Sequence, residues 1–242
     1  MIAILSDIHG NYVALSAVLR EVDRLDVSKV ICLGDTAGYY NQINECCDEL
    51  RAREVFSLMG NHDRYLTSDE ACPRSDAATR CIEYQATIID ASHLAWLASL
   101  PSSAQIHGLD LVHGGWNDPL EEYMTPTAEY FADKTGPVFA SGHTHEQLVW
   151  SDGLKQYCNP GSVGQPRDGD PRSAFATWNG ERFELHRVEY DVRAAQVSMT
   201  KAGFDPYFSN NLAFGLRIGA RPDPTSFSHQ RDVGPNESTK TS

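Results

Sequence analysis

The chain begins with short apolar runs that alternate with segments whose apolar side chains recur at helical spacing. Each run has the length of a buried strand, and the spacing i, i+3, i+4, i+7 is typical of an amphipathic helix. Asn11 stands where the N-cap of the first helix is expected. The expected strands are 2–5, 30–33 and 54–59, and the expected helices are 12–25 and 43–50. This β-α-β-α-β order predicts parallel strands joined by right-handed crossovers.

The pattern changes in the second half of the chain. Residues 76–100 have helical spacing that is interrupted near Ala91 and ended by Pro101. Short apolar segments follow, separated by Gly, Asn, Asp and Pro, and Asp152-Gly153 and Asn179-Gly180 are hairpin signals. The expected strands are 104–106, 109–113, 138–141, 147–150, 155–158, 173–178 and 182–188. This strand-rich half indicates two facing sheets with helices outside them.

Three regions divide the chain. Residues 1–190 carry the strand and helix pattern of one domain, and 191–220 are expected to form a helical extension packed on it. Residues 221–242 are polar, contain three prolines and lack apolar periodicity, so we expect a disordered tail.

Composition and charge narrow the class of protein. A chain of 242 residues with 41% hydrophobic residues can bury a full core, and no window is apolar enough to span a membrane. The six cysteines show no paired spacing, which favours reduced thiols and a cytoplasmic location. The net charge of -13 argues against binding to duplex nucleic acid or anionic membranes. Nothing in the sequence supports a homo-oligomer.

Five short segments place metal-ligand side chains just after predicted strands. Strand ends are where open α/β sheets gather functional groups. The segments are Asp7-Ile8-His9, Gly34-Asp35, Gly60-Asn61-His62-Asp63, His113-Gly114 and Gly142-His143-Thr144-His145. Imidazole nitrogens with carboxylate and amide oxygens suit Mn, Fe or Zn. We therefore expect one site with two metal ions and the ligands Asp7, His9, Asp35, Asn61, His113, His143 and His145.

Each of these residues has an ordinary alternative role. A single histidine is more often a core or surface residue, and an aspartate after a strand is commonly a helix cap. Five of the nine histidines fall in these segments, however, so coincidence is a poor explanation. Asp35 has no adjacent ligand histidine, and we expect its two oxygens to bridge the two ions.

The order of the five segments resembles the calcineurin-like metallophosphoesterases, particularly the small bacterial and archaeal phosphodiesterase-like branch. The resemblance continues through the segment from Asn159 to Gly164 and covers roughly residues 1–190. Asp35 follows Asp7 by 28 residues and Asn61 follows Asp35 by 26, which is similar to the family spacing. The implied fold is an α/β four-layer α/β/β/α sandwich of two facing mixed sheets.

The resemblance also implies roles for the candidate residues. One divalent ion would be held by Asp7, His9, Asp35 and His145, and the other by Asp35, Asn61, His113 and His143. The ions would be Mn, Fe, Zn, Ni or Co and would activate a bridging hydroxide that attacks a phosphoester in line. His62 matches the catalytic histidine, which protonates the leaving oxygen or stabilises charge on the phosphoryl group. The expected substrate is a small phosphorylated molecule such as a nucleotide.

Several residues near the motifs keep two interpretations. Asn11 could bind a substrate phosphate or cap the first helix, and Asp63 could orient His62 or open a helix. Arg167 could contact anionic groups of a substrate, but it lies in a polar loop where solvation is the favoured interpretation. Trp116 could stack on a base or pack its loop.

Alternative functions remain open. The Asp-Arg-Gly segment of Ser/Thr protein phosphatases is absent after Gly34-Asp35, which argues against that activity. A nucleotide pyrophosphohydrolase similar to the diadenosine tetraphosphatases would need a longer groove and basic contacts. A catalytically idle metal-binding scaffold for protein partners is disfavoured because every ligand position is filled.

Overall fold

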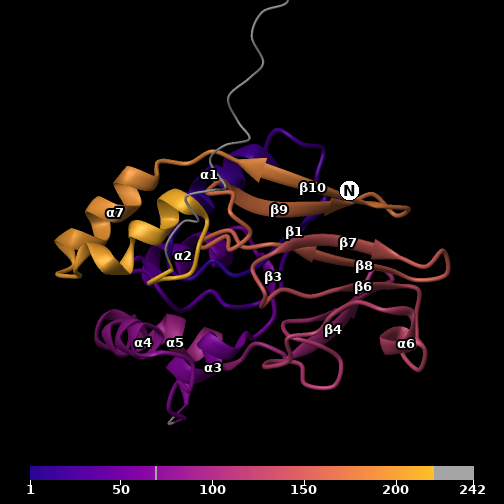
Figure 1. Cartoon of the computed structure of the whole chain (residues 1–242), viewed down its shortest axis with the longest axis horizontal. Coiled ribbons are helices and arrows are strands. Elements are labelled where there is room, and N and C mark those ends of the chain that lie inside the picture. Colours follow the sequence, from indigo (N-terminus) through magenta and orange to yellow (C-terminus); the bar gives the residue numbers. More distant parts are fainter. Residues whose placement is uncertain (69, 221–242) are drawn as a thin grey trace, which may run out of the picture.

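Two facing five-stranded sheets form the centre of the molecule, as the computed structural model shows for residues 1–68 and 70–220 (Figure 1). The first sheet has the order β10-β9-β1-β2-β3, and the second has the order β4-β5-β6-β8-β7. The first comprises β1 (Ile2–Leu5), β2 (Lys29–Cys32), β3 (Phe56–Ser57), β9 (Ser173–Trp178) and β10 (Phe183–Val188). The second comprises β4 (Ser103–Ile106), β5 (Leu109–Val112), β6 (Val138–Ala140), β7 (Gln147–Ser151) and β8 (Gln156–Pro160).

Both sheets are mixed, as expected. Strands β1, β2 and β3 pair in parallel, and so do β5, β6 and β8. Antiparallel partners are added by β9 and β10 in the first sheet and by β4 and β7 in the second. The chain thus returns to its first sheet only after it has completed the second.

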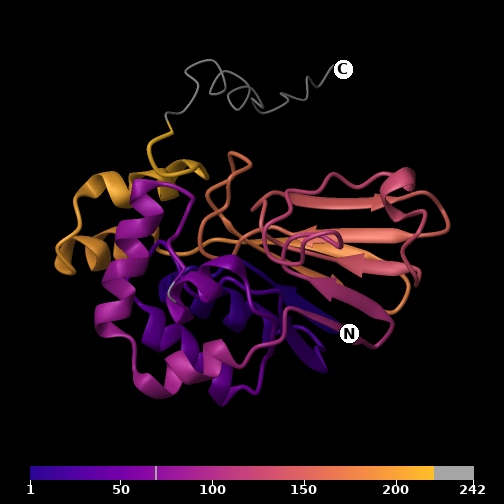
Figure 2. The same ribbon diagram turned by 90° about the horizontal axis from the view of Figure 1, so that it is seen from below.

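Helices lie outside the two sheets. They are α1 (Tyr12–Val22), α2 (Ile43–Ala52), α3 (Asn61–Thr67), α4 (Asp76–Ile88), α5 (Ala91–Ala98), α6 (Ala128–Phe131) and α7 (Val192–Lys201), followed by the 3-10 helices Pro206–Phe208 and Asn210–Phe214. Figure 2 shows the helices gathered at one end of the sheets, except for α6. The predicted four-layer α/β/β/α fold is confirmed, although the layer outside the second sheet has only α6 and irregular chain.

Side chains alternate between the two faces of each sheet. In β1, Ile4 enters the core between the sheets, where it joins Leu111 of β5, whereas Leu5 faces Leu15 of α1. A continuous apolar run such as β1 is therefore explained by burial on both faces. Asn11 caps α1 as expected, because its side chain accepts a hydrogen bond from the backbone N–H of Ala14.

Some elements differ from the sequence expectation. Strand β3 has two residues where 54–59 was expected, and it pairs only with the end of β2. The helical region breaks at residues 89 and 90, slightly before the expected position. Helix α6 has four residues and was not predicted, since so short a segment shows no helical periodicity.

Trp116 packs its loop on the outer face of the second sheet. Its ring makes edge contacts with Phe131 and Phe139, and its Nε1 donates a 2.8 Å hydrogen bond to Asp110. Of the two roles considered for Trp116, the structure shows packing of the loop.

Residues 191–220 pack against α1 and α4 (Figure 1). Met199 and Phe208 are buried in one cluster with Tyr40, which follows the Asp35 segment. The proposed tail 221–242 lies outside the described residues. Within the described part of the chain, no helix is long and apolar enough to cross a membrane. All six cysteines carry free thiols.

The core between the sheets gives a test of the fold. Leu111→Ala should lower the free energy of unfolding by about 2–5 kcal/mol, because the cavity between two sheets cannot close fully. Leu154→Ala, in the exposed turn between β7 and β8, should change it by less than about 0.5 kcal/mol. Urea unfolding of both variants measures the difference, and equal effects would contradict the core assignment.

Candidate metal centre

The five predicted segments meet where the carboxyl ends of the central strands of both sheets come together. Asp7 and Asp35 follow β1 and β2, and His113 and His143 follow β5 and β6. A side chain links the two sheets directly here, since His113 Nδ1 lies 3.0 Å from the carbonyl oxygen of Leu33. All seven predicted ligands are at most 3% exposed. Sequence segments more than a hundred residues apart thus form one buried cluster.

Three histidines are oriented by backbone carbonyl groups. The Nδ1 atoms of His9, His113 and His145 lie 2.8, 3.0 and 2.6 Å from the carbonyl oxygens of Ala37, Leu33 and Gln165. A carbonyl oxygen only accepts, so each Nδ1 carries a proton, and Nε2 points inward with its lone pair available whenever the ring is neutral. A hydrogen bond of this kind is what orients metal-binding histidines in proteins.

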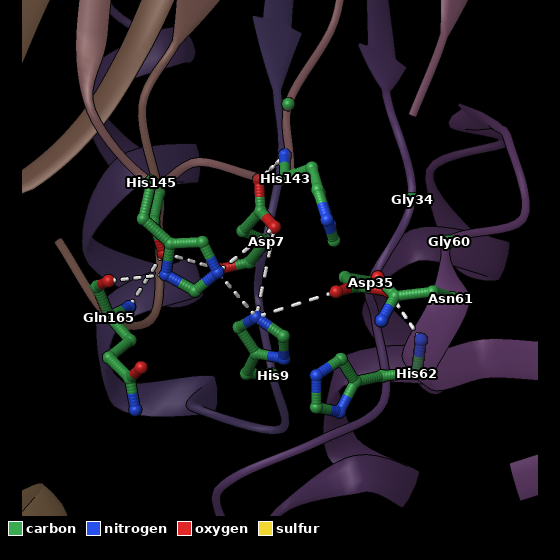
Figure 3. A network of polar contacts seen from close by, with 12 residues as sticks. Asp7, His9, Gly34, Asp35, Gly60, Asn61, His62, His143, His145 and Gln165 are labelled. Atoms are coloured by element: carbon green, nitrogen blue, oxygen red, sulfur yellow. Dashed lines mark hydrogen bonds and ion pairs between the residues drawn. The ribbon is translucent and has the colours of Figure 1, made fainter. Parts of the chain in front are cut away.

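The Nε2 atoms of His9 and His145 point at each other and at a carboxylate oxygen, all of which carry lone pairs. His9 Nε2 and His145 Nε2 are 3.0 Å apart, and Asp7 Oδ1 lies 3.7 and 3.2 Å from them (Figure 3). Asp7 Oδ1 is buried and has no hydrogen-bond partner among the described residues, whereas Asp7 Oδ2 accepts from the backbone N–H of His143. Such electron-rich atoms repel one another unless a cation lies among them. This donor set fits a divalent transition-metal ion.

A second group of donors lies beside the first. His113 Nε2 is 3.1 Å from Asn61 Oδ1 and 3.2 Å from His143 Nδ1. Asp35, His113 and His143 each offer a ligand atom, and the three atoms lie within 4.8 Å of one another. His143 would therefore bind through Nδ1, in contrast to the other three histidines.

Asp35 lies between the two groups. Its Oδ2 is 3.6 Å from His9 Nε2 and 3.4 Å from His113 Nε2. Its Oδ1 accepts a hydrogen bond of 2.8 Å from the backbone N–H of His62, which fixes the carboxylate. This position is compatible with a bridging carboxylate, and the bridging role of Asp35 stays a prediction.

Backbone strain is concentrated at the cluster. Among the described residues seven non-glycine residues have positive φ, and five of them are predicted ligands. These five are Asp7, His9, Asp35, His143 and His145, with φ between 54° and 67°. Left-handed backbone is uncommon outside glycine, and it persists at sites where the surrounding structure enforces it.

Burial and charge set the protonation of the cluster. Burial raises the pKa of Asp35, but His113 and its neighbours outweigh it and hold this pKa well below its ordinary value. Burial lowers the pKa of His113, but Asp35 outweighs it and raises this pKa to about 9. Burial also holds the pKa of His9 well below its ordinary value. A proton on His113 and a metal ion would therefore compete for Nε2.

Asp63 supports the cluster through the backbone. Its carboxylate accepts hydrogen bonds of 2.8, 2.8 and 2.9 Å from the N–H groups of Asp35, Ala37 and Gly60. The bond to Gly60 also closes the first turn of α3. Of the two interpretations of Asp63, the structure shows the helix-opening role and records no hydrogen bond to His62.

His62 lies at the edge of the cluster. Its ring centroid is 4.9 Å from those of both His9 and Tyr39, and its Nδ1 is buried without a hydrogen-bond partner among the described residues. Burial lowers its pKa to about 4, and Arg167 adds to this effect. One of its nitrogens lies within 4.8 Å of donor atoms of His9 and Asp35, so geometry alone would also allow it to bind a metal.

The side chain of Asn11 already makes two hydrogen bonds. Its Oδ1 accepts from Ala14, and its Nδ2 donates a bond of 2.9 Å to the carbonyl oxygen of Gly164. To bind a phosphate through its amide, Asn11 would have to give up the bond to Gly164. Substrate binding by this residue stays a prediction.

Sequence reasoning missed a group of residues beside the cluster. Arg167 lies 5.4 Å from the ring centroid of Tyr39, whose ring contacts His9, so the solvated-loop interpretation of Arg167 was wrong. Tyr123 has its ring centroid 4.1 Å from that of His143. No motif marks either residue. The only sequence signal was the position of Arg167 in the loop that follows the segment Asn159 to Gly164.

Comparison with known proteins places this cluster in a family. Residues 1–181 match the calcineurin-like phosphoesterase superfamily domain. The uncharacterized protein MJ0912 of Methanocaldococcus jannaschii is 32% identical over 240 residues, covering 89% of this chain and 98% of that protein. A metallophosphoesterase from Sphaerobacter thermophilus, known from its crystal structure, is 31% identical with a TM-score of 0.79, covering 89% of this chain and 98% of that one.

A third comparison concerns the fold alone. The hypothetical protein PH1004 from Pyrococcus horikoshii OT3 is 19% identical with a TM-score of 0.79, covering 89% of this chain and 99% of that one. The protein described here belongs to the calcineurin-like phosphoesterase superfamily and is a metallophosphoesterase. Its buried His and Asp clusters are consistent with a dinuclear metal site.

Asp63 offers a test of how the cluster is held. Asp63→Ala should weaken manganese binding by about 10- to 100-fold, because three N–H groups that position Asp35 lose their acceptor. Isothermal titration with Mn²⁺ measures the affinity, and circular dichroism checks that the variant is folded. Asp133→Ala, which removes an exposed carboxylate, is the control. Unchanged affinity in a folded Asp63→Ala variant would show that the carboxylate does not support the site.

Proposed function

We propose that the protein hydrolyses phosphoester bonds of a small phosphorylated substrate at a centre of two divalent transition-metal ions. The observation that carries this proposal is the position of Asp35 Oδ2, which faces a histidine of each donor group. A single carboxylate shared by two sets of imidazole and oxygen donors is the arrangement expected of a dinuclear site.

The proposed ligands divide into two sets around Asp35. One ion would be bound by Asp7, His9, Asp35 and His145, and the other by Asp35, Asn61, His113 and His143. When bound, such ions lower the pKa of a shared water molecule and neutralise charge on phosphoryl oxygens. The donor set suits Mn, Fe, Zn, Ni or Co and does not choose among them.

The protein itself supplies orientation and a dry site. Backbone carbonyl groups fix the ligand histidines, and burial keeps bulk water from competing with the substrate. His62 is proposed as the catalytic histidine. Its ring lies against His9, and its unpaired Nδ1 is free to protonate the leaving oxygen or to donate a hydrogen bond to the phosphoryl group.

Two alternative functions were considered in the sequence: a catalytically idle scaffold and a nucleotide pyrophosphohydrolase. An idle scaffold is disfavoured because the donors converge, with His9 and His145 nitrogens 3.0 Å apart and His113 and His143 nitrogens 3.2 Å apart. A nucleotide pyrophosphohydrolase would use the same metal chemistry on another substrate, so the residues around the centre decide between it and a simple phosphoesterase.

The first test combines metal analysis with activity. Protein purified without chelator should contain close to two divalent ions per chain and should hydrolyse bis(p-nitrophenyl) phosphate. Asp35→Asn should lower turnover by at least about 100-fold and reduce the metal content, because the shared ligand loses its charge. Asp26→Asn, at an exposed position, is the control. An inactive wild-type protein that divalent metals cannot activate would refute the proposed function.

His62→Ala tests the separate role of the catalytic histidine. Turnover should fall by about 10²- to 10⁴-fold while the metal content stays at the wild-type value. Inductively coupled plasma mass spectrometry and hydrolysis of the same substrate measure the two quantities. Loss of one ion per chain would instead identify His62 as a ligand.

A further inference from the structure

A cavity of about 460 Å³ lies against the metal centre. Three of its lining residues contact proposed ligands. The Tyr39 ring is 4.7 Å from that of His9, and the Tyr123 ring is 4.1 Å from that of His143. The Gln165 carbonyl oxygen accepts the hydrogen bond from His145. The volume is in the range of small-molecule sites, and the position suits the part of a substrate beyond the scissile phosphate.

Arginines line this cavity although the chain has a net charge of -13. Arg167 is half-buried, and its Nε and Nη2 donate hydrogen bonds of 3.0 and 2.7 Å to Gln165 Oε1. The guanidinium is thereby held over the ring of Tyr39 at the wall of the cavity. A fixed guanidinium of this kind is suited to phosphate binding.

Arg217 comes from the C-terminal extension and lines the same cavity. Within residues 1–68 and 70–220, neither Arg167 nor Arg217 forms an ion pair with a carboxylate. Arg74 differs, because its guanidinium pairs with Glu121. Arg217 is exposed and Arg167 is half-buried, so both guanidinium groups are accessible to an anion in the cavity, and neither has a carboxylate partner among the described residues.

A second cavity of about 380 Å³ continues from the first. The two cavities share Tyr123 and Arg217, so these residues lie where one joins the other. The second cavity is lined by apolar side chains, among them Met124, Pro126 and Leu148, and by polar ones, among them Thr125, Glu146 and Asn159. An organic group such as a nucleoside fits these walls better than a free phosphate does.

We propose that Arg167 and Arg217 form a subsite for a second phosphate group, so that the substrate carries two or more phosphates in a phosphoanhydride chain with an organic group attached. This inference rests on the proposed function. Hydrolysis would place the hydroxyl of water on the attacked phosphorus and its remaining proton on the leaving oxygen. The arginines would bind the phosphate that is not attacked.

Paired substrates test the subsite on the manganese-loaded protein. Diadenosine tetraphosphate has several linked phosphates, whereas bis(p-nitrophenyl) phosphate has one. The wild-type protein should have the higher kcat/KM for diadenosine tetraphosphate. In Arg167→Met and Arg217→Met, the kcat/KM for diadenosine tetraphosphate divided by that for bis(p-nitrophenyl) phosphate should fall by about 10- to 100-fold. A loss of this size is expected when one charge-assisted hydrogen bond to the substrate is removed. Sodium tripolyphosphate, which lacks an organic group, should be the poorer substrate.

Binding provides a measurement that does not depend on turnover. Methylenediphosphonate should bind the manganese-loaded protein at least about tenfold more tightly than inorganic phosphate, and this advantage should disappear in Arg167→Met and Arg217→Met. Isothermal titration measures both affinities at the same manganese concentration.

Two arginines provide matched controls. Arg172 lies in the same loop as Arg167 but is paired with Asp170, and Arg193 lies exposed on α7 in the same extension as Arg217. Arg172→Met and Arg193→Met should leave the substrate ratio within about twofold of the wild-type value. A protein that hydrolyses bis(p-nitrophenyl) phosphate with the same ratio in all four variants would overturn the subsite alone. A protein inactive on every phosphoester would overturn the proposed function.

Discussion

The need to neutralise two buried carboxylates governs the structure around this site. Asp7 and Asp35 are ionised, almost fully buried and surrounded by imidazole nitrogens whose lone pairs point toward them. A buried charge is costly unless it is paired, and histidines that must remain neutral to bind metal cannot pair with it by proton transfer. Divalent ions satisfy the carboxylates and the imidazoles together. The cluster is therefore consistent with a dinuclear metal site, and it lies buried where the two sheets meet.

The backbone positions this unit more than side chains do. Backbone carbonyl groups orient His9, His113 and His145. The backbone N–H of His62 holds the carboxylate of Asp35, and the carboxylate of Asp63 holds the backbone N–H of Asp35. Close approach of neighbouring strand-end segments requires residues without side chains. A Cβ at Gly142 would lie 1.9 Å from Ser6 Oγ, and one at Gly60 would lie 2.1 Å from Asp35 Oδ1. The glycines in the motifs thus serve the contact between segments, while the strained left-handed conformations fall on the ligands themselves.

Local signals predicted most of the centre, and long-range packing determined what they missed. The apolar run 2–5 and the hairpin turns gave strands and their approximate limits, and the ligands followed because each stands at a strand end. The return of β9 and β10 to the first sheet depends on pairing across the whole chain, which no local pattern encodes. Arg217 and Tyr123 belong to irregular segments without a motif, and they reach the centre only because the extension and the 114–127 loop fold back over it. Arg167 was misjudged for the same reason, since the loop looks polar until Tyr39 and Gln165 are placed beside it.

The C-terminal extension is joined to the metal centre through a short chain of hydrogen bonds. Asn211 donates to the hydroxyl oxygen of Tyr40, which also accepts from the side chain of Gln165 at 3.0 Å. The backbone carbonyl of that same Gln165 orients His145, and its side-chain oxygen holds Arg167. One buried residue therefore positions a proposed ligand, an arginine of the cavity and the contact to the extension. A change in the extension would reach both the proposed ligand His145 and the cavity residue Arg167 through Gln165, so residues 191–220 are physically connected to the site, although the sequence motifs end before them.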